Sequence, residues 1–487
     1  MSAPATRPSR RLATPLVLVA GAALLRVVGG VGFANYDTLY ALAWGGQLGR
    51  GQTPAYDVAI APTPHPLLEA LGLVLSPLPA DAIEWLAVAV GFLALAGCGA
   101  IVYRLGADWF GRAAGVVAAA VLLTRVPVLS YGVRAYVDLP FLALVLAALA
   151  VESRTHLRDS RPAGMPVLAL LALAGLLRPE AWALSGMYWL YVLAWSRRRS
   201  AQPPLAASSA RLALLAVAAP LVWMLSDLAI TGDALWSLTH TRHTAHQLGR
   251  VTGIANAPEY VPRRLGEILR PVVLAGAALG GVLALACLHR RALLGAAAGA
   301  AGVIVFVAVA AAGLSINTRY AFLTASILCV FCGAGAFGWV KLPLGDPRRR
   351  PWALAGAALV AALLISAPSQ LRAADRELDK LSSQQHIQDD LVSLVKSGAV
   401  NLRCGPVGVP SHAPIPLLSL YLSASPRHII DAQTEQILRG VYVDPASREV
   451  EATYVLDPHD PHVPVGVPPG FRAVAANHSW LIFRRCA

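Results

Sequence analysis

The sequence predicts a polytopic α-helical membrane protein with about eleven transmembrane helices and a small extracytoplasmic α/β domain. Hydrophobic residues make up 56% of the 487 residues and charged residues only 14%, whereas a soluble domain carries about 25% charged residues. Stretches such as 271–288 and 292–313 have the roughly 20 apolar residues with which a helix crosses hydrocarbon. Arg-rich gaps between such stretches alternate with gaps that hold acidic residues and His.

The net charge of +13 does not indicate a nucleic-acid-binding protein, because the Lys and Arg residues flank the apolar stretches. Cytoplasmic loops of membrane proteins concentrate Lys and Arg in this way. If there are eleven spans, all the Arg-rich gaps face the cytoplasm, the N-terminus is inside and the C-terminus is outside. The predicted spans are 12–33, 82–104, 112–128, 138–152, 164–178, 180–195, 211–230, 271–288, 292–313, 320–340 and 351–368.

Two apolar stretches need separate interpretation. Residues 12–33 are longer than the core of a signal peptide and lack a small-x-small cleavage site, so we expect them to stay as the first span. Residues 66–79 are apolar but short, and they are broken by Pro77 and Pro79. We expect a surface or re-entrant helix there, because a crossing would move every later loop to the other side and break the Arg pattern.

The chain divides into a membrane domain, residues 1–369, and a tail, residues 370–487. The tail has Pro and Gly punctuation and short β-like runs, which predict a small α/β domain with its own core. An outside location permits a disulfide between Cys404 and Cys486, although two unpaired thiols are the alternative. The expected elements are helices over 375–395 and 415–423, and strands at 407–409, 428–430, 453–456, 471–474 and 480–483.

The first predicted outer loop, residues 33–81, contains the strongest chemical signal. Asp37 lies just past the end of the first span, where a polar side chain can meet a lipid head group. It could also be the N-cap of a helix over 38–48, and Asp57 could be an Asx-turn residue. The candidate substrate-binding residues in this loop are Tyr36, Tyr40, Asp57, His65 and Glu69.

Three short motifs at the ends of later spans fall on the same predicted face. In the first, Arg134 and Asp138 are four residues apart and could form an ordinary helical ion pair. In the second, Arg178 and Glu180 could form a structural pair at a helix turn. In the third, Arg319 precedes Tyr320 with no acidic residue nearby in the sequence, and we expect it to face a polar cavity.

The second outer loop, residues 232–270, has His residues at three-residue spacing from His240 to His246. This spacing could bind a metal, but no carboxylate or Cys lies nearby to complete a site. A cationic helix that lies on anionic lipid or contacts a phosphate is the alternative that we favour. The candidate residues in this loop are Arg242 and His243.

These features together resemble the GT-C superfamily of membrane glycosyltransferases. The resemblance rests on a first span that ends at Asp37, an amphipathic helix with Tyr and Ala, and a stretch from Tyr56 to Pro64-His-Pro-Leu67. It is similar in particular to the branch of protein O-mannosyltransferases and lipid A aminoarabinose transferases. The three Arg motifs resemble segments of that branch, and the likeness covers about residues 12–370. The branch often has an acidic-Lys-Pro-Pro stretch where this chain has Thr-Pro-His-Pro at 63–66.

The resemblance implies inverting transfer of a sugar from a polyprenyl-phosphate donor to an acceptor hydroxyl at the outer face of the plasma membrane. A carboxylate can act as the general base for the hydroxyl, and Asp37 is the candidate. Guanidinium groups suit the donor phosphate, and the candidates are Arg319, Arg134, Arg178 and Arg242. The expected substrate-binding residues are Tyr36, Tyr40, Asp57, His65, Glu69, Asp138, Glu180, His243 and Tyr320.

The sugar and the acceptor are predicted from the family resemblance rather than from particular residues. Mannose or arabinose is the expected sugar, and a cell-envelope glycan, lipid or protein is the expected acceptor. No cofactor is certain, although a divalent metal stays open. An Ala- and Arg-rich, Lys-poor composition is typical of a GC-rich bacterial genome, such as that of an actinomycete.

Two other classes of protein remain as alternatives. A polyprenyl-lipid flippase or secondary transporter usually shows internal repeats and charges near the bilayer midplane, and neither is evident in the sequence. A non-catalytic membrane anchor with a glycan-binding tail would leave Asp37 and Arg319 without a role. Such an anchor would tolerate Asp37→Asn, because Asn caps helices as well as Asp does.

Overall fold

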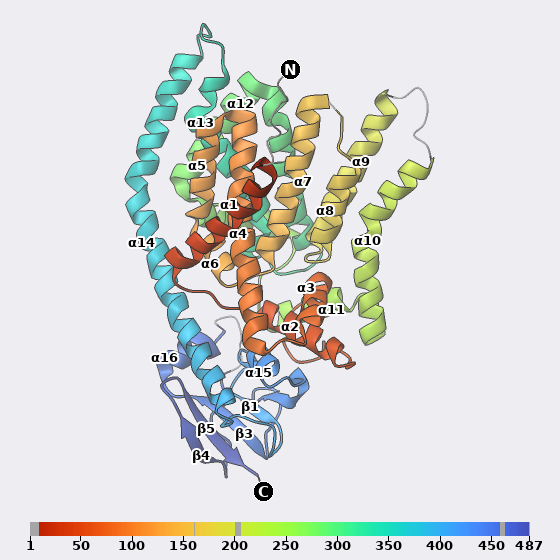
Figure 1. Ribbon diagram of the computed structural model, residues 1–487, viewed down its shortest axis with the longest axis vertical. Helices are drawn as coiled ribbons and strands as arrows, with labels where there is room; N and C mark the ends of the chain where they lie inside the picture. Colours follow the sequence, from red (N-terminus) through yellow and green to blue (C-terminus); the bar gives the residue numbers. More distant parts are fainter. Residues whose placement is uncertain (1–8, 160, 200–205, 458–462, 487) are drawn as a thin grey trace, which may run out of the picture.

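The structure is a computed structural model that describes residues 9–159, 161–199, 206–457 and 463–486. Most helices run along the long axis of the molecule and form a bundle, and a five-stranded sheet lies at one end of it (Figure 1). Strand β5, the last described element, lies at the sheet end, and helix α1, the first described element, lies within the bundle. The sequence-predicted tail is therefore spatially separate from most of the bundle.

The stretches predicted to cross the membrane are helical. In the part of the chain described, six helices are long and apolar enough to span a membrane, or seven if the bent pair α5 and α6 is one span. This confirms a polytopic membrane protein, while the count of eleven spans stays a prediction. The bundle helices are α1 (Ser9–Gly29), α4 (Ala80–Phe110), α5 (Arg112–Leu123), α6 (Val126–Val133), α7 (Asp138–Asp159), α8 (Met165–Gly175), α9 (Glu180–Arg199), α10 (Ala206–Thr231), α12 (Ala257–Ala311), α13 (Phe322–Phe337) and α14 (Arg349–Lys396).

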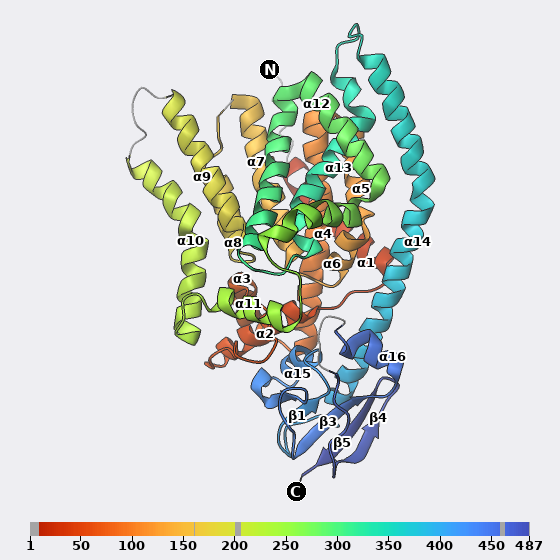
Figure 2. The same ribbon diagram turned by 180° about the vertical axis from the view of Figure 1, so that it is seen from behind.

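Helix α12 contains two breaks. Its backbone is non-helical at Arg270 and at Leu288. The two predicted spans, 271–288 and 292–313, therefore lie on either side of the second break in α12. Pro271 explains the first break, because a proline restricts the preceding residue and removes a backbone donor. The α4–α5 and α13–α14 connections lie at the end of the bundle away from the sheet (Figures 1 and 2), and just after the second break Arg291 donates to the carbonyl of Asp108 near the end of α4 at 3.1 Å.

Two short helices form a layer between the bundle and the sheet (Figure 1). They are α2 (Tyr36–Gly49) and α3 (Pro66–Leu75). They pack closely because both have glycine at the contact. A Cβ atom on Gly45 would lie 2.4 Å from the carbonyl oxygen of Glu69. Helix α11 (Trp236–Gln247) lies beside this layer, so both predicted outer loops meet there.

Helix α14 connects the bundle to the sheet domain. It is one helix of 48 residues, and it combines the last predicted span with the helix expected over 375–395. Pro368 lies inside it without ending it. The predicted boundary between residues 369 and 370 therefore falls within a continuous helix, and the chain leaves that helix only after Lys396.

The sheet has strand order β2-β1-β3-β5-β4. Strands β2, β1 and β3 are parallel, whereas β5 is antiparallel to both of its neighbours. Helix α15 (Ile415–Tyr421) follows β1, and a disulfide joins Cys404 to Cys486 at the end of β5. The strands are β1 (Val407–Val409), β2 (Ile429–Asp431), β3 (Gly440–Pro445), β4 (Arg472–Ala476) and β5 (Trp480–Arg485).

One predicted strand of the tail is wrong. Residues 453–456 were expected to be extended, but Glu451–Val455 forms a π-helical turn after α16 (Arg448–Val450). Tyr454 and Val455 are buried there, which explains the apolar pattern. A short apolar run has the same appearance in a strand and in a buried helical turn. Strand β3, which the sequence reading omitted, takes the central place in the sheet.

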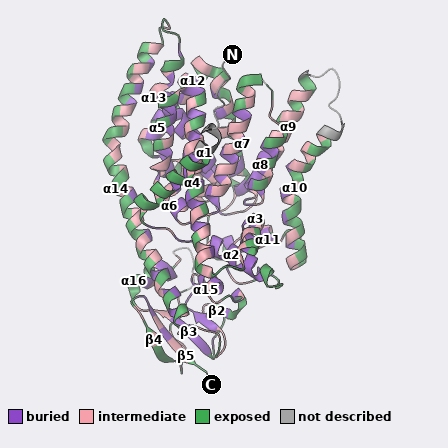
Figure 3. Cartoon of the chain, in the orientation of Figure 1, coloured by how far each residue is buried: buried purple, intermediate pink, exposed green. Residues whose placement is uncertain are grey.

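Burial follows the expected division between lipid-facing and interior surfaces. Buried residues gather inside the bundle and around α2 and the sheet, and exposed residues follow the outer faces of α10 and α14 (Figure 3). Many of these exposed residues are large and apolar, for example Leu225 at 62% and Ile365 at 81% exposure. Exposed apolar surface of this extent marks an interaction surface, and hydrocarbon is the environment that suits it.

Candidate functional site

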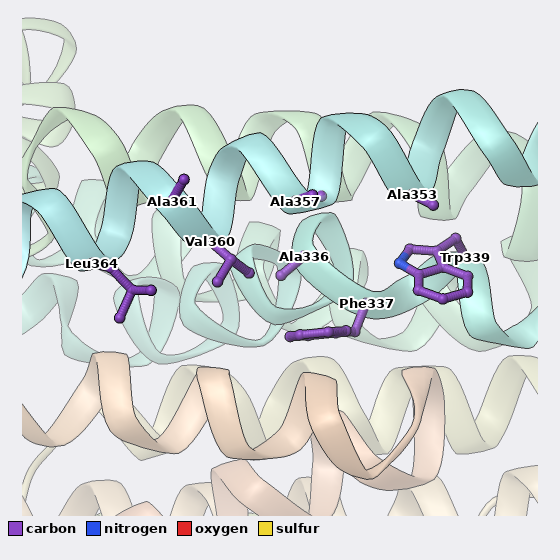
Figure 4. A pocket seen from close by; sticks show the side chains of 9 residues that line it. Ala336, Phe337, Trp339, Ala353, Ala357, Val360, Ala361 and Leu364 are labelled. Atoms are coloured by element: carbon purple, nitrogen blue, oxygen red, sulfur yellow. The ribbon is translucent and has the colours of Figure 1, made fainter.

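Two cavities differ sharply in their chemistry. The smaller, of about 360 Å³, is a groove between α13 and α14 with apolar side chains such as Phe337, Val360 and Leu364 (Figure 4). Apart from the Trp339 indole, its lining has no polar side chain. The larger cavity, of about 730 Å³, has carboxylates, guanidinium groups and aromatic rings in its lining. Only the larger one can support acid–base or phosphate chemistry, so it is the candidate site.

The candidate site lies where the bundle, the outer helices and the tail meet. Its lining includes Asp37, Arg134, Arg178 and Arg319 from different parts of the membrane domain. Residues of both predicted outer loops also contribute, and so do His412 and the segment 453–457 of the tail. Four of the sequence-predicted polar residues thus share one cavity although they are far apart in the chain.

Asp37 lies in the first turn of α2, with Asn35 as the N-cap. The Asn35 side-chain oxygen accepts hydrogen bonds from the backbone N–H groups of Asp37, at 2.8 Å, and Thr38, at 3.2 Å. The alternative in which Asp37 caps this helix is therefore excluded. Asn35 also donates through its amide to the carbonyl of Arg134 at 3.0 Å, which fixes the start of α2 against the end of α6. The Asp37 carboxylate is left to line the cavity.

Asp37 forms an ion pair with Arg319, which lies in the short η2 helix (Thr318–Ala321). The guanidinium is 3.1 Å from the Asp37 carboxylate and 3.8 Å from that of Asp138. Burial raises the pKa of Asp37, but the charge and hydrogen bond of Arg319, together with smaller contributions from other nearby groups, outweigh burial and hold the pKa below its usual value. Asp37 is therefore ionised at neutral pH. Among the described residues, the buried Nε of Arg319 has no hydrogen-bond acceptor.

A second ion cluster lies behind this pair. Arg178 donates to Asp138 and to Glu180, and all three side chains are buried. The Arg178–Glu180 pair considered from the sequence is thus present. Its guanidinium also lies over the ring of Tyr320, 5.0 Å from the centroid. Two carboxylates neutralise Arg178, and Asp138 connects it to Arg319.

Arg134 does not pair with Asp138, although the two are four residues apart. Its side chain donates to the backbone oxygen of Ser130 at 3.2 Å and to the Ser130 hydroxyl at 2.9 Å. The guanidinium lies over the ring of Tyr136, 4.9 Å from the centroid. Arg134 is half-buried, lines the cavity and forms no ion pair within the described ranges. Its positive charge is available to a ligand.

His65 and Glu69 have different roles in the structure. His65 precedes α3 and lines the cavity, and burial lowers its pKa to about 4, so it is neutral at pH 7. Glu69 is not part of the cavity lining and accepts hydrogen bonds from the His65 backbone at 3.0 Å and the Tyr56 hydroxyl at 2.5 Å. Burial raises the pKa of Glu69 to about 7. Glu69, in the first turn of α3, therefore has a structural role.

The two tyrosines of α2 also differ. Tyr36 lines the cavity and donates to the carbonyl of Ile60 at 3.1 Å. Tyr40 is buried below it, with ring centroids 5.0 Å apart, and packs on Trp44. Tyr40 thus supports Tyr36 and is not part of the cavity lining.

Besides Tyr40, Glu69 and Asp138, three further predicted site residues are not part of the cavity lining. Asp57 forms an exposed ion pair with Arg427 at 2.8 Å. Arg242 and His243 lie on the exposed side of α11, where the Arg242 side chain donates to the backbone oxygen of Ala312. The physical reason is the orientation of α11, which turns its small residues inward and its charged residues outward.

The structure does not offer a fitted metal site. Among the residues that it describes, no group of three or more His, Cys, Asp or Glu side chains is placed to hold a metal ion. The His240 ring stacks on Trp236 and contacts the carbonyl of Ala61 at 3.3 Å instead. We therefore derive no catalytic step through a metal.

Sequence reasoning missed several residues of the cavity. Trp182 and Trp223 occur within predicted spans, where aromatic residues are ordinary. Arg250, in the second predicted outer loop, also lines the cavity and lies 3.7 Å from Asp457 of the tail. Arg250 follows the His-rich segment 240–246 in the sequence. Its position outside that helical segment was the signal that could have set it apart as a cavity residue.

The fold and the cavity define a class: a multi-helix membrane protein with one ion-paired cavity at its border with a terminal domain. Comparisons with known proteins agree with the sequence resemblance to the GT-C superfamily, through a partial sequence match and a shared fold. Residues 65–223 match the sequence model of a family described as dolichyl-phosphate-mannose-protein mannosyltransferase. No curated protein matches the sequence significantly.

Two solved structures share the fold over nearly the whole chain. One is ArnT from Cupriavidus metallidurans bound to undecaprenyl phosphate, with a TM-score of 0.58, 14% identity, and coverage of 97% of this chain and 98% of that one. The other is the same protein in the apo state, with a TM-score of 0.57, 14% identity, and coverage of 98% of each chain.

Proposed function

We propose that this chain is a membrane glycosyltransferase that moves a sugar from a polyprenyl-phosphate donor to a hydroxyl group of a cell-envelope acceptor. The observation that carries the proposal is the 3.1 Å contact between Asp37 and Arg319 within the cavity. A base and a phosphate-binding cation are the two groups that this chemistry needs. The matching family and the ArnT complex with undecaprenyl phosphate support the choice of donor.

The proposed reaction is one displacement at the anomeric carbon. The acceptor oxygen forms a bond to that carbon while its proton passes to the Asp37 carboxylate. The bond between the anomeric carbon and the phosphate oxygen breaks, and polyprenyl phosphate leaves with the electron pair. A single displacement inverts the configuration. Phosphate is a good leaving group, so cations rather than a general acid stabilise its growing charge.

Arg319 couples donor binding to the strength of the base. Before the donor binds, Arg319 pairs with Asp37 and lowers its pKa, which makes the carboxylate a weak base. A donor phosphate competes for the same guanidinium, whose Nε has no acceptor in the described structure. When Arg319 turns to the phosphate, the pKa of Asp37 rises and the carboxylate becomes a stronger base. The acceptor is thus activated only when a donor is present.

The other arginines of the cavity have different proposed roles. Arg134 and Arg250 line it with charge that a phosphate can use. Arg178 is neutralised by Asp138 and Glu180, so we assign it to positioning. It fixes Asp138, whose second oxygen lies 3.8 Å from Arg319, and so orients the guanidinium.

We place the cavity on the extracytoplasmic side of the plasma membrane. Arg-rich connections lie at the far end of the bundle, and the positive-inside rule assigns that end to the cytoplasm. The Cys404–Cys486 disulfide suits an oxidising compartment. Eleven spans with the N-terminus inside agree with this orientation. Mannose and arabinose remain the first sugars to test.

The test is release of lipid phosphate from a panel of polyprenyl-phosphate sugars by the purified full chain, with an envelope extract as acceptor. Asp37→Asn should lower the rate by roughly a hundredfold or more, because general-base catalysis contributes about 10²–10⁴. Asp81→Asn is the matched control, since Asp81 forms an exposed pair with Lys396. Full turnover by Asp37→Asn would remove Asp37 from the mechanism, and no turnover of any sugar by the natural chain would contradict the transferase.

A further inference from the structure

One wall of the cavity consists of aromatic rings from three separate segments. Trp182 of α9 and Trp223 of α10 lie edge to face, with centroids 5.5 Å apart and planes at 82°. His65 packs on Trp223 in the same way, at 6.2 Å and 86°. All three residues line the cavity. We infer that this aromatic wall, together with Glu180, binds the sugar ring of the donor, an inference that rests on the proposed function.

Hydrogen bonds within the protein fix both indoles. Trp182 donates from its ring nitrogen to the carbonyl of Gly175 at 3.0 Å. Trp223 donates to the hydroxyl of Ser237 at 2.9 Å, and that hydroxyl donates to Asp227, also at 2.9 Å. Since both N–H groups are used, the indoles offer only carbon to a ligand. A rigid carbon surface suits the C–H face of a sugar ring.

Two polar atoms of this wall remain for a ligand. Glu180 Oε2 and His65 Nδ1 are buried and have no hydrogen-bond partner in the described part of the chain. Arg178 bonds only the other oxygen of Glu180. Buried polar atoms without partners are costly, so they are rare unless a ligand completes them. Sugar hydroxyls can donate to a carboxylate oxygen and to a neutral imidazole nitrogen.

The combination defines the class of sugar. A prenyl chain has apolar carbon but no hydroxyl, so it would leave Glu180 and His65 unsatisfied. An acidic sugar would bring a second carboxylate close to Glu180 and to Asp227, which is buried in the same region. The subsite therefore favours a neutral or amino sugar over a uronic acid. The phosphate then lies toward Arg319 and Arg134, which line the same cavity.

The test measures binding rather than transfer. Affinities of the full chain in lipid nanodiscs would be compared for polyprenyl phosphate alone and for the same lipid with a neutral hexose, a neutral pentose, an amino sugar or a uronic acid. We expect at least one neutral or amino sugar to tighten binding about tenfold, the effect of one or two well-placed hydrogen bonds. The uronic acid should give no gain.

Trp182→Leu should abolish the sugar-dependent gain and leave the affinity for sugar-free lipid unchanged. His65→Phe keeps an aromatic ring against Trp223 and removes the nitrogen, so it should lose part of the gain. Trp85→Leu is the control, because Trp85 is 68% exposed on α4. Thermal unfolding of each variant separates loss of a contact from loss of the fold.

The outcomes separate this inference from the proposed function. If Trp182→Leu weakens the binding of sugar-free lipid as much as that of sugar-bearing lipid, the aromatic wall binds the first isoprene unit and the inference is wrong. If no sugar tightens binding, it is also wrong. Sugar binding that depends on Trp182 without transfer to any acceptor would overturn the transferase but keep the subsite. Sugar transfer that is unchanged in Trp182→Leu would contradict the sugar subsite but not the transferase.

Discussion

Replacing Arg319 with Gln should change both the rate and its pH dependence. Two unit charges 3.1 Å apart interact by about 5 kcal/mol at an effective dielectric constant of about 20. Water that enters beside the smaller side chain screens part of this energy, and an opposite charge at such distances shifts a carboxyl pKa by about 1–3 units. The pKa of Asp37 should therefore rise by about 1–3 units, because burial then acts without its opposing charge.

The sign of the effect follows from the role of the base. Asp37 works only when ionised, so the rate falls as the pH drops through its pKa. In the natural chain this acidic limb lies below the usual range for Asp, and in Arg319→Gln it should move up by about 1–3 pH units. The rate at the optimum should also fall by roughly 10²–10³, the cost of one transition-state donor.

The assay is the pH profile of kcat/KM for release of lipid phosphate, with each variant normalised to its own maximum. Arg348→Gln serves as the control, because Arg348 is exposed and pairs with Asp346. A lower rate with an unmoved acidic limb would show that Asp37 is not the titrating base. An unchanged rate would refute the proposed role of Arg319 altogether.

Two further predictions concern stability. Replacing both Cys404 and Cys486 with Ser should lower the unfolding free energy of the tail by about 2–5 kcal/mol, because the disulfide closes a long loop. Thermal unfolding of the oxidised natural chain and of the variant would measure the difference in stability, and equal midpoints would contradict the pairing. Burial raises the pKa of Glu69 from 4.5 to about 7. Between these pH values the folded protein holds a proton on Glu69 that the unfolded chain releases. The stability of the protein should therefore fall as the pH rises from about 4.5 to 7. Glu69→Gln should flatten this decline in a series of melts from pH 5 to 8, and an equally steep decline would exclude Glu69 as its source.

Much of the charged core of the site could be predicted because it follows from the ends of spans. Asp37 and Arg319 both lie at the boundary of a predicted helix on the same predicted face, and polar residues at such positions have few other environments available. Their contact across 282 residues required the fold. The capping question could not be decided from sequence either, because Asn35 and Asp37 are equally good caps. Only the backbone geometry shows that Asn35 takes that role.

The aromatic wall could not be predicted for a different reason. Trp182 and Trp223 belong to helices with apolar residues on all sides, so periodicity does not distinguish a lipid-facing from a cavity-facing residue. On α11 the opposite problem arises. Arg242 and His243 have the right chemistry, but small residues decide which side of this helix packs inward. Chemical type predicts candidates, whereas packing selects among them.

The position of the tail bears on the alternative of a non-catalytic anchor. A separable glycan-binding tail would hold its binding surface within its own fold and connect to the membrane through a linker. Here α14 passes from the bundle to the sheet domain without a break, and no linker separates the two. His412 and the segment 453–457 line the same cavity as Asp37, and Asp457 lies 3.7 Å from Arg250 of the membrane domain. The tail thus completes the cavity in which the membrane domain holds its charges, and this arrangement favours one shared site over an anchor with an appended binding module.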